Sequence, residues 1–144
     1  MTATCELCSN DGGTLLWRDG LCRVVLVDDA RFPGFCRLIW HSHVKEMSDL
    51  ADSSQAYVFR LLMAVETAII RTMHPDKINL ASFGNMTPHL HWHLIPRWMD
   101  DSHFPQAVWA AAERASPNRT VDVAALQTEI RELCSRVKKM EDTQ

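Results

Sequence analysis

Residues 89–95 read His-Leu-His-Trp-His-Leu-Ile. The three histidines alternate with apolar residues, and on an extended strand residues two apart point to the same side, about 6.6 to 6.8 Å apart. We therefore expect the three imidazoles on one strand face, with the core on the other side receiving Leu90, Trp92 and Leu94. Three imidazoles on one face are costly to desolvate unless they are partnered or meet a ligand. The row thus indicates a functional site.

Two kinds of chemistry use such a row. In one, a His-x-His pair binds a transition metal that activates water, with another histidine and a carboxylate completing the site. In the other, one imidazole attacks phosphorus as a nucleophile while its neighbours orient it and manage the protons of the leaving group. The spacing alone does not choose between them.

The segments around the histidines predict strands on both sides of one long helix. Short β-favouring runs occur at 15–17, 21–27, 35–40 and 77–83, in addition to the histidine strand at 89–96. The first two runs flank an Asp-Gly pair, a strong hairpin signal. Apolar residues at three- and four-residue steps predict a helix over 53–73, with Asp52 or Ser53 as its N-cap, and a C-terminal helix over 123–137. This order favours an α+β fold, in which helices pack against an antiparallel sheet.

Length and composition narrow the function further. The chain has 144 residues, of which 47% are hydrophobic and 23% charged, so we expect one globular domain over 1–144. The net charge of -3 favours neither a nucleic acid nor an anionic membrane as partner. No apolar run approaches the roughly 18 residues that span a bilayer. Five cysteines, an odd number, and a start without signal-peptide character indicate a soluble protein of the reducing cytoplasm.

Residues 89–95 resemble the signature of the histidine triad (HIT) superfamily, in which three histidines alternate with hydrophobic residues. Supporting similarities are Ile78-Asn79, Pro33-Gly34 before a strand, and His43-Val44 ahead of the long helix, so the resemblance covers roughly residues 5 to 98. Residues 83–88 and 95–97 are most similar to bacterial proteins of the dinucleoside polyphosphate hydrolase-like branch. The resemblance implies a five-stranded antiparallel sheet with two main helices, a homodimer, and a nucleotide bound against the histidine strand.

The resemblance also implies a role for individual residues. His89, His91 and His93 would form the catalytic row. The central residue, His91, would attack the α-phosphate and form a nucleotidyl-histidine intermediate. His93 would contact the phosphate and assist the leaving group. Asn79 would orient the site or bind phosphate, and Asp28 would bind the ribose hydroxyls.

The turn before the histidines offers further phosphate contacts. The backbone N–H groups of Gly84 and Asn85 and the Thr87 hydroxyl are suited to surround non-bridging phosphate oxygens. Relatives that bind nucleotides usually have a serine or threonine where this chain has Met86, so Thr87 is the candidate for the hydroxyl contact, with a plain turn role as the alternative.

Cys5 and Cys8 have the two-residue spacing that lets both thiolates reach one zinc ion, although such a pair alone is a weak signal. In some HIT relatives the pair binds a structural zinc together with the histidine before the long helix and the first histidine of the triad. The matching residues here are His43 and His89. An unmetallated thiol pair is the alternative, and His41 is a second candidate for the place of His43. No organic cofactor is expected.

These patterns leave three hypotheses for the function. The first is an enzyme that cleaves a phosphoanhydride or phosphoramidate bond through His91, with dinucleoside polyphosphates ahead of nucleoside phosphoramidates as substrates. The second is a nucleotide-binding module with negligible turnover, and the third is a metallohydrolase that uses the histidine row as ligands. Trp17, in the first hairpin, is a candidate for the nucleobase pocket, and residues 104–109 are candidates for a cap over the phosphate site.

Overall fold

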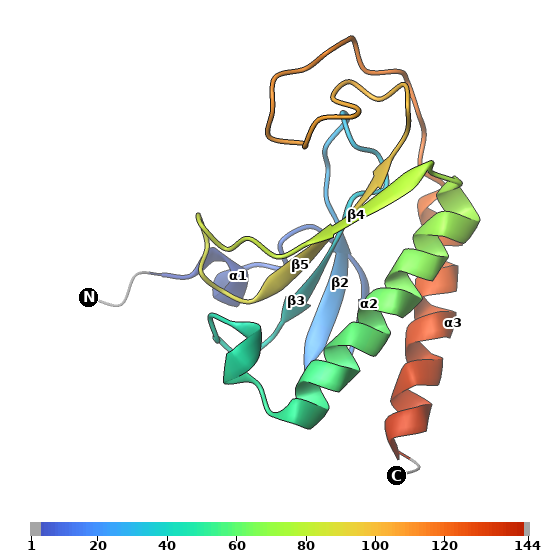
Figure 1. Cartoon of the computed structure of the whole chain (residues 1–144). Coiled ribbons are helices and arrows are strands. Elements are labelled where there is room, and N and C mark those ends of the chain that lie inside the picture. Colours follow the sequence, from blue (N-terminus) through green and yellow to red (C-terminus); the bar gives the residue numbers. More distant parts are fainter. Residues whose placement is uncertain (1–3, 143–144) are drawn as a thin grey trace.

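The computed structural model describes residues 4–142. A five-stranded antiparallel sheet has two long helices on one face and a short helix on the other (Figure 1). The strands run in the order β1-β2-β3-β5-β4 and comprise β1 (Thr14–Arg18), β2 (Cys22–Leu26), β3 (Cys36–Trp40), β4 (Lys77–Ala81) and β5 (His91–Arg97). The helices are α1 (Glu6–Ser9), the 3-10 turn η1 (Met47–Asp49), α2 (Asp52–Met73) and α3 (Val123–Asp142). The α+β class expected from the sequence is confirmed.

The register of the central strands gives the sheet two different faces. Leu38 of β3 pairs with Trp92 of β5, whereas Arg37 pairs with His93 and Ile39 pairs with His91. Because successive side chains alternate between faces, His91, His93 and Arg37 share one face and Trp92 lies on the other. The register confirms the expected face for His91 and His93, whereas His89 lies before the strand.

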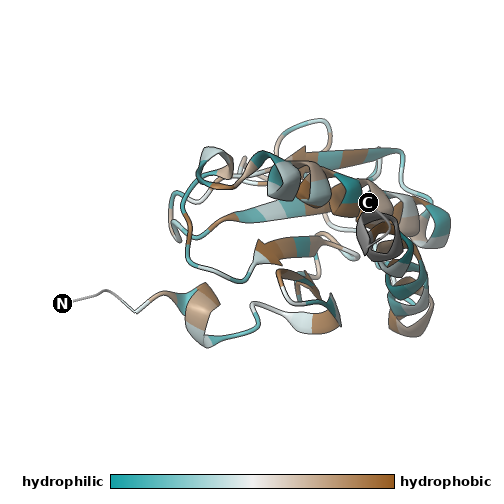
Figure 2. Ribbon diagram, turned by 90° about the horizontal axis from the view of Figure 1, so that it is seen from below, coloured by the Kyte–Doolittle hydropathy of each residue, from teal (hydrophilic) through white to brown (hydrophobic). Residues whose placement is uncertain are grey.

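The core lies between the sheet and the long helices. Val24, Leu38 and Leu94 of the strands pack in one cluster with Leu61 of α2 and Leu126 of α3, each at most 1% exposed. Figure 2 shows brown, hydrophobic residues concentrated on the strands, while brown and teal residues alternate along the helices. Each long helix therefore has one buried side, as its periodicity predicts.

The N-terminal segment covers part of the opposite face. Leu7 of α1 packs against Val25 and Ile39. The buried guanidinium of Arg23 donates hydrogen bonds to the carbonyls of Leu7, Asn10 and Asp11, at 2.7 to 2.9 Å. Four residues are too few to form an isolated helix, so these tertiary contacts hold α1 in place. The sequence did not predict this element.

Other differences concern the ends of elements. The long helix begins at Asp52 with Ala51 as its N-cap and no side-chain capping bond, so the expected capping role of Asp52 or Ser53 is wrong. The histidine strand begins at His91 instead of His89, because the Leu90 N–H donates to Val44 in the segment before α2. None of the described helices is both long enough and apolar enough to cross a membrane.

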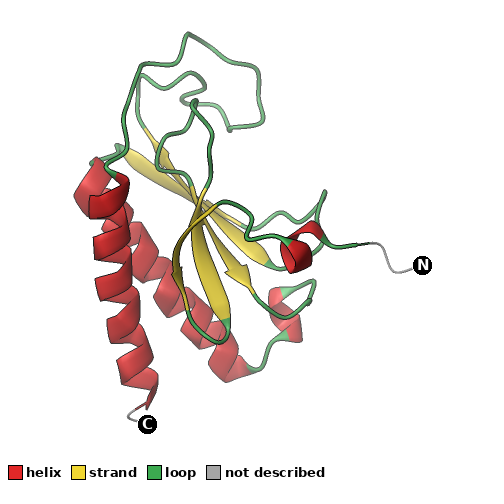
Figure 3. Cartoon of the chain, turned by 180° about the vertical axis from the view of Figure 1, so that it is seen from behind, coloured by secondary structure: helices red, strands yellow, loops and turns green. Residues whose placement is uncertain are grey.

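The chain between β5 and α3 forms an irregular loop (Figures 1 and 3). Asp101, which is 2% exposed, accepts hydrogen bonds from the Arg97 guanidinium at 2.8 and 3.1 Å and from the N–H groups of Trp98, His103 and Phe104. Burial raises the pKa of Asp101, but these bonds outweigh it and hold that pKa at about 2. The loop is therefore fixed to the end of β5.

Candidate functional site

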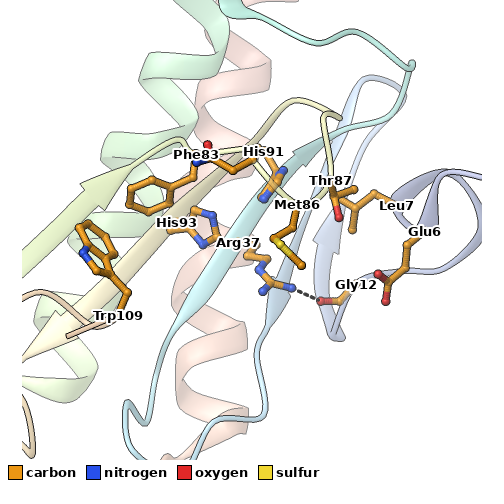
Figure 4. Close-up of a pocket in the computed structure, with 12 residues that line it drawn as sticks. Glu6, Leu7, Gly12, Arg37, Phe83, Met86, Thr87, His91, His93 and Trp109 are labelled. Atoms are coloured by element: carbon orange, nitrogen blue, oxygen red, sulfur yellow. Dashed lines mark hydrogen bonds between the residues drawn. The ribbon is translucent and has the colours of Figure 1, made fainter. Parts of the chain in front are cut away.

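A cavity of about 700 Å³ opens on the sheet face that carries His91 and His93 (Figure 4). Three segments line it: the N-terminal segment, the turn before β5 and the loop after it, together with one arginine of β3. The lining residues are Glu6, Leu7, Gly12, Arg37, Phe83, Gly84, Asn85, Met86, Thr87, His91, His93 and Trp109. The structure thus brings His91 and His93 together with Gly84, Asn85 and Thr87, as the sequence predicts.

His91 is oriented by a backbone contact. Its Nδ1 lies 2.6 Å from the carbonyl oxygen of His89, and since that oxygen can only accept, Nδ1 carries the proton. Nε2 of the neutral ring then keeps its lone pair. Burial, with a contribution from the nearby Arg37 charge, lowers the pKa of His91. The imidazole is thus held in the form a nucleophile requires.

His93 lies beside His91, with 4.9 Å between the ring centroids. Burial lowers its pKa to about 4, and the neighbouring His91 and Arg37 add to the effect. At neutral pH His93 therefore carries no charge and offers one N–H donor and one acceptor. The aromatic rings of Phe35 and Phe83 lie 5.6 and 5.2 Å from it.

Arg37 is a cavity residue that the sequence reasoning missed. Its Nη1 donates to the Gly12 carbonyl at 3.3 Å, while its Nε is buried without a hydrogen-bond partner. Burial also lowers the pKa of this guanidinium. A partly unsatisfied cation beside two neutral imidazoles suits an anion such as a phosphate. A charged residue inside the apolar run 35–40 was the available signal, but only the register shows which face it takes.

The turn before β5 forms one wall of the cavity. Gly84 has a φ of 75°, a left-handed conformation that favours glycine, and it lets the chain turn toward β5. Met86 is 96% exposed. Thr87 is half-buried and lines the cavity.

Three of the predicted catalytic and nucleotide-binding residues, Asn79, Asp28 and His89, lie outside the lining of this cavity. Asn79 of β4 accepts a hydrogen bond from Arg97 at 2.8 Å and so joins the network that fixes the following loop. This placement favours an orienting role over direct phosphate contact. Asp28 is exposed just beyond β2, on the segment leading to β3.

The aromatic residue at the cavity is not the one the sequence suggested. Trp17 is buried in the core cluster and does not line this cavity. Trp109 lines the cavity instead, within the segment considered as a cap over the phosphate site. Its ring meets Phe83 edge to face, with the centroids 5.0 Å apart.

A second cluster joins three distant parts of the chain. One ligand atom from each of Cys5, Cys8, His43 and His89 lies within 4.8 Å of all the others. His89 Nδ1 is 3.4 Å from each of the two sulfurs and 3.2 Å from His43 Nδ1, and Cys8 Sγ is 3.4 Å from His43 Nδ1. His41 is not part of this group.

These four donors can hold a metal ion. A tetrahedral zinc ion, with Zn–S bonds of about 2.3 Å and Zn–N bonds of about 2.0 to 2.1 Å, would separate sulfur and nitrogen ligands by about 3.5 Å. His89 Nε2 lies 2.5 Å from the Trp40 carbonyl oxygen, so it donates its proton there and leaves Nδ1 free to bind. His89 therefore faces the cysteines rather than His91 and His93, an arrangement that speaks against the three histidines acting together as ligands of a catalytic metal.

This fold and this histidine row define the class of protein. The HIT domain family matches residues 10–99, so the chain belongs to the HIT family. Among solved structures, a histidine triad protein from Marinobacter aquaeolei VT8 is 25% identical with a TM-score of 0.71, over 92% of this chain and 95% of that one. Another from Bradyrhizobium japonicum is 25% identical with a TM-score of 0.66, over 90% of each chain.

A curated relative carries an enzyme name. The AP-4-A phosphorylase of Mycobacterium tuberculosis (strain ATCC 25618 / H37Rv) is 26% identical over 102 residues, which are 67% of this chain and 52% of the phosphorylase. The chain thus spans about half the length of the curated relatives it matches.

Proposed function

We propose that this protein is a nucleotide hydrolase or transferase that cleaves a phosphoanhydride or phosphoramidate bond at the nucleoside α-phosphate, with dinucleoside polyphosphates as substrates. The observation that carries the proposal is the contact between His91 Nδ1 and the His89 carbonyl at 2.6 Å. This contact leaves the lone pair of Nε2 free, at a cavity that is also lined by the positively charged side chain of Arg37. The similarity to the AP-4-A phosphorylase supports the choice of substrate.

The reaction has two displacements at one phosphorus atom. His91 Nε2 attacks the α-phosphorus, and the bond to the leaving group breaks with its electron pair passing to a leaving oxygen that departs as an anion, or to a leaving nitrogen that takes a proton from solvent and departs as an amine. Water or another acceptor then attacks the nucleotidyl-histidine and releases its proton to solvent, the P–N bond breaks with its electron pair returning to Nε2, and neutral His91 is restored. A neutral His93 is no ready-made acid, which favours leaving groups such as polyphosphates that depart as anions.

Arg37 and the other predicted site residues receive roles in binding. Arg37, the N–H of His93 and the N–H groups of Gly84 and Asn85 stabilise charge on the phosphate oxygens, with the Thr87 hydroxyl as a further donor. In the proposal, Asn79 positions the site through Arg97, and Asp28 binds the ribose hydroxyls.

We assign a structural zinc ion to Cys5, Cys8, His43 and His89. All four positions are protein ligands, so the ion would hold the N-terminal segment and the start of β5 together and would not activate water. The homodimer implied by the resemblance is part of the same proposal. It is supported by Phe59, Met63 and Ile70, which lie on α2 and are 44 to 47% exposed.

Intact-mass measurement tests the nucleophile. The wild type, His91→Ala and the control His74→Asn are incubated briefly with a diadenosine polyphosphate or an adenosine phosphoramidate, while AMP release is followed. His74 is the left-handed C-cap of α2, a position that asparagine tolerates. We expect an adenylate adduct or AMP release with the wild type and His74→Asn, and neither with His91→Ala.

The same experiment separates the alternative function. A wild type that binds AMP but turns over neither substrate would favour the nucleotide-binding module. Turnover that survives His91→Ala would exclude the covalent mechanism.

A further inference from the structure

Met86 is the most exposed of the large apolar side chains that the structure describes, at 96%. It lies in the turn before β5, between the left-handed Gly84 and the half-buried Thr87. A side chain that contacts so little of the protein contributes little to folding. A change in the polarity of Met86 should therefore leave the fold unaltered.

This exposed thioether also belongs to the main cavity. Met86 lines it together with His91, His93 and Arg37. In Figure 4 the Met86 side chain projects over the cavity, and its sulfur points toward the Arg37 guanidinium. Chemistry at this sulfur is therefore exposed to solvent and close to the cation that the cavity offers to an anion.

The other methionines whose side chains the structure describes do not combine these two properties. Met47 and Met73 are partly buried and pack against the core. Met63 and Met99 are 44% and 69% exposed, but neither lines the main cavity or the smaller one beside it. Met86 is thus the described methionine at which oxidation would reach the ligand site.

A thioether reacts with peroxides by transfer of one oxygen atom. The sulfur lone pair attacks one oxygen of hydrogen peroxide, and the O–O bond breaks with its electron pair passing to the other oxygen. The hydroxide so formed takes the proton from the transferred oxygen and leaves as water. Sulfur is oxidised by two electrons and the peroxide is reduced, so methionine becomes methionine sulfoxide.

The sulfoxide changes what an anion meets in the cavity. Its oxygen carries partial negative charge and accepts hydrogen bonds, whereas the thioether is a weak acceptor. Arg37 can supply a donor, because its Nε is buried without a partner and its Nη1 makes a hydrogen bond of 3.3 Å to the Gly12 carbonyl. A sulfoxide over the cavity competes with phosphate for this guanidinium and also repels the phosphate oxygens.

We propose that Met86 is a modification site, at which peroxide oxidation to the sulfoxide lowers the affinity of the cavity for phosphate-bearing ligands. The proposal rests on the proposed function, which makes a nucleotide the ligand of this cavity. Methionine sulfoxide is reduced enzymatically, one reductase acting on each epimer, so the loss of affinity is reversible.

The test compares AMP binding before and after oxidation. The chain is treated with hydrogen peroxide and then with dithiothreitol, which reduces the disulfides and sulfenic acids of cysteine but leaves sulfoxides. Met86→Leu keeps an apolar side chain without an oxidisable sulfur, and Met99→Leu is the matched control on an exposed residue outside the cavities. Peptide mass mapping locates the added oxygen, and calorimetric titration measures the affinity.

We expect oxidation to weaken AMP binding roughly tenfold in the wild type and in Met99→Leu, but less than about twofold in Met86→Leu. Methionine sulfoxide reductases of both epimer specificities should restore the lost affinity. Each protein is compared with its own untreated form, so a small effect of a substitution on binding does not enter the ratio.

Three results would overturn the proposal. Equal losses in Met86→Leu and the wild type would assign the effect to other residues. A sulfoxide at Met86 with unchanged AMP affinity would show that the cavity does not sense it, and oxidation of Met99 without oxidation of Met86 would show a shielded sulfur. The proposed function is tested separately, because an untreated wild type that binds AMP but forms no adenylate adduct on His91 would refute that function and still allow the comparison of affinities.

Discussion

Arg37 favours the binding of an anion but does not favour the stability of the folded protein. Its Nε is buried without a partner, so the folded protein holds a cation that is incompletely satisfied until an anion binds. Replacing a buried charge with an apolar side chain of similar volume is often neutral or stabilising. The unpartnered guanidinium on the central strand β3 therefore fits a role in binding an anionic ligand.

Arg37→Leu should lower kcat/KM for a diadenosine polyphosphate by roughly 100-fold, about 2.7 kcal/mol of lost transition-state stabilisation. Its free energy of unfolding in urea should equal or exceed that of the wild type. Arg37→Lys keeps the charge but loses the planar fork, so we expect an intermediate rate. A variant that is less stable yet fully active would make Arg37 a structural residue.

His93 makes stability depend on pH. Burial lowers its pKa from the usual 6.5 to about 4, so between these values the unfolded chain binds the proton more readily than the folded chain. The free energy of unfolding is therefore highest above pH 6.5, where His93 is neutral in both states, and it decreases as the pH falls toward 4. We expect a loss of about 2 kcal/mol, less than the full shift gives, because solvent partly screens the ring.

Denaturant unfolding of the wild type and His93→Gln at several pH values isolates this contribution. The difference in unfolding free energy between the two proteins should change by about that amount between pH 7 and pH 4.5. Parallel curves for the two proteins would mean that His93 titrates normally in the folded chain.

At the level of elements, the loop after β5 depends on one carboxylate. Asp101→Asn removes the charge that pairs with buried Arg97 and leaves that guanidinium uncompensated, which should cost about 3 to 5 kcal/mol of stability. We also expect weaker AMP binding, because the same network fixes the loop that carries Trp109.

The matched control is the neighbouring Asp100→Asn. Asp100 pairs with Arg119 at 2.6 Å, but its side chain is 63% exposed, so its loss should cost at most about 1 kcal/mol. Urea unfolding measures the stability of both variants, and protease cleavage within 98–120 measures the opening of the loop. Similar losses in the two variants would contradict an anchoring role for Asp101.

The sequence predicted regular elements better than irregular ones. The long helix and the histidine strand have strong periodicity, and the apolar residues that recur at those periods do pack into the core. The short helix α1 has no such signal, because bonds from Arg23 to three carbonyls hold it. The position of Trp109 could not be predicted for the same reason, since tertiary bonds rather than local preference shape its loop.

Site residues could be predicted where their pattern lies within one short stretch of the sequence. His91 and His93 follow from a period-two pattern within one strand, and their shared face is confirmed by the register. Arg37 reaches them only through the pairing of β3 with β5, which no local pattern contains. Asn79 lies near these histidines in the sequence, yet its side-chain oxygen accepts a hydrogen bond from Arg97.

For the whole molecule, the Cys-His cluster connects segments that are far apart in the sequence. Cys5 and Cys8 belong to the N-terminal segment, His43 follows β3, and His89 precedes β5. A bound ion would cross-link all three, and because the unfolded chain has no such preformed site, binding energy adds to folding energy. The N-terminal segment also supplies Leu7 and Gly12 to the cavity, so the ion would help to shape the site without touching substrate.

Metal analysis of the purified chain should find about one zinc ion per chain. His89→Ala should lose it, whereas His91→Ala, two residues along the same row, should keep it, since His91 Nδ1 is bonded to a carbonyl and its ring faces the cavity. Chelation should lower Tm, and readdition of zinc should restore it. Zinc that disappears from both variants would instead indicate a metal shared along the histidine row, and the nucleophilic role of His91 would then have to yield to water activated by that metal.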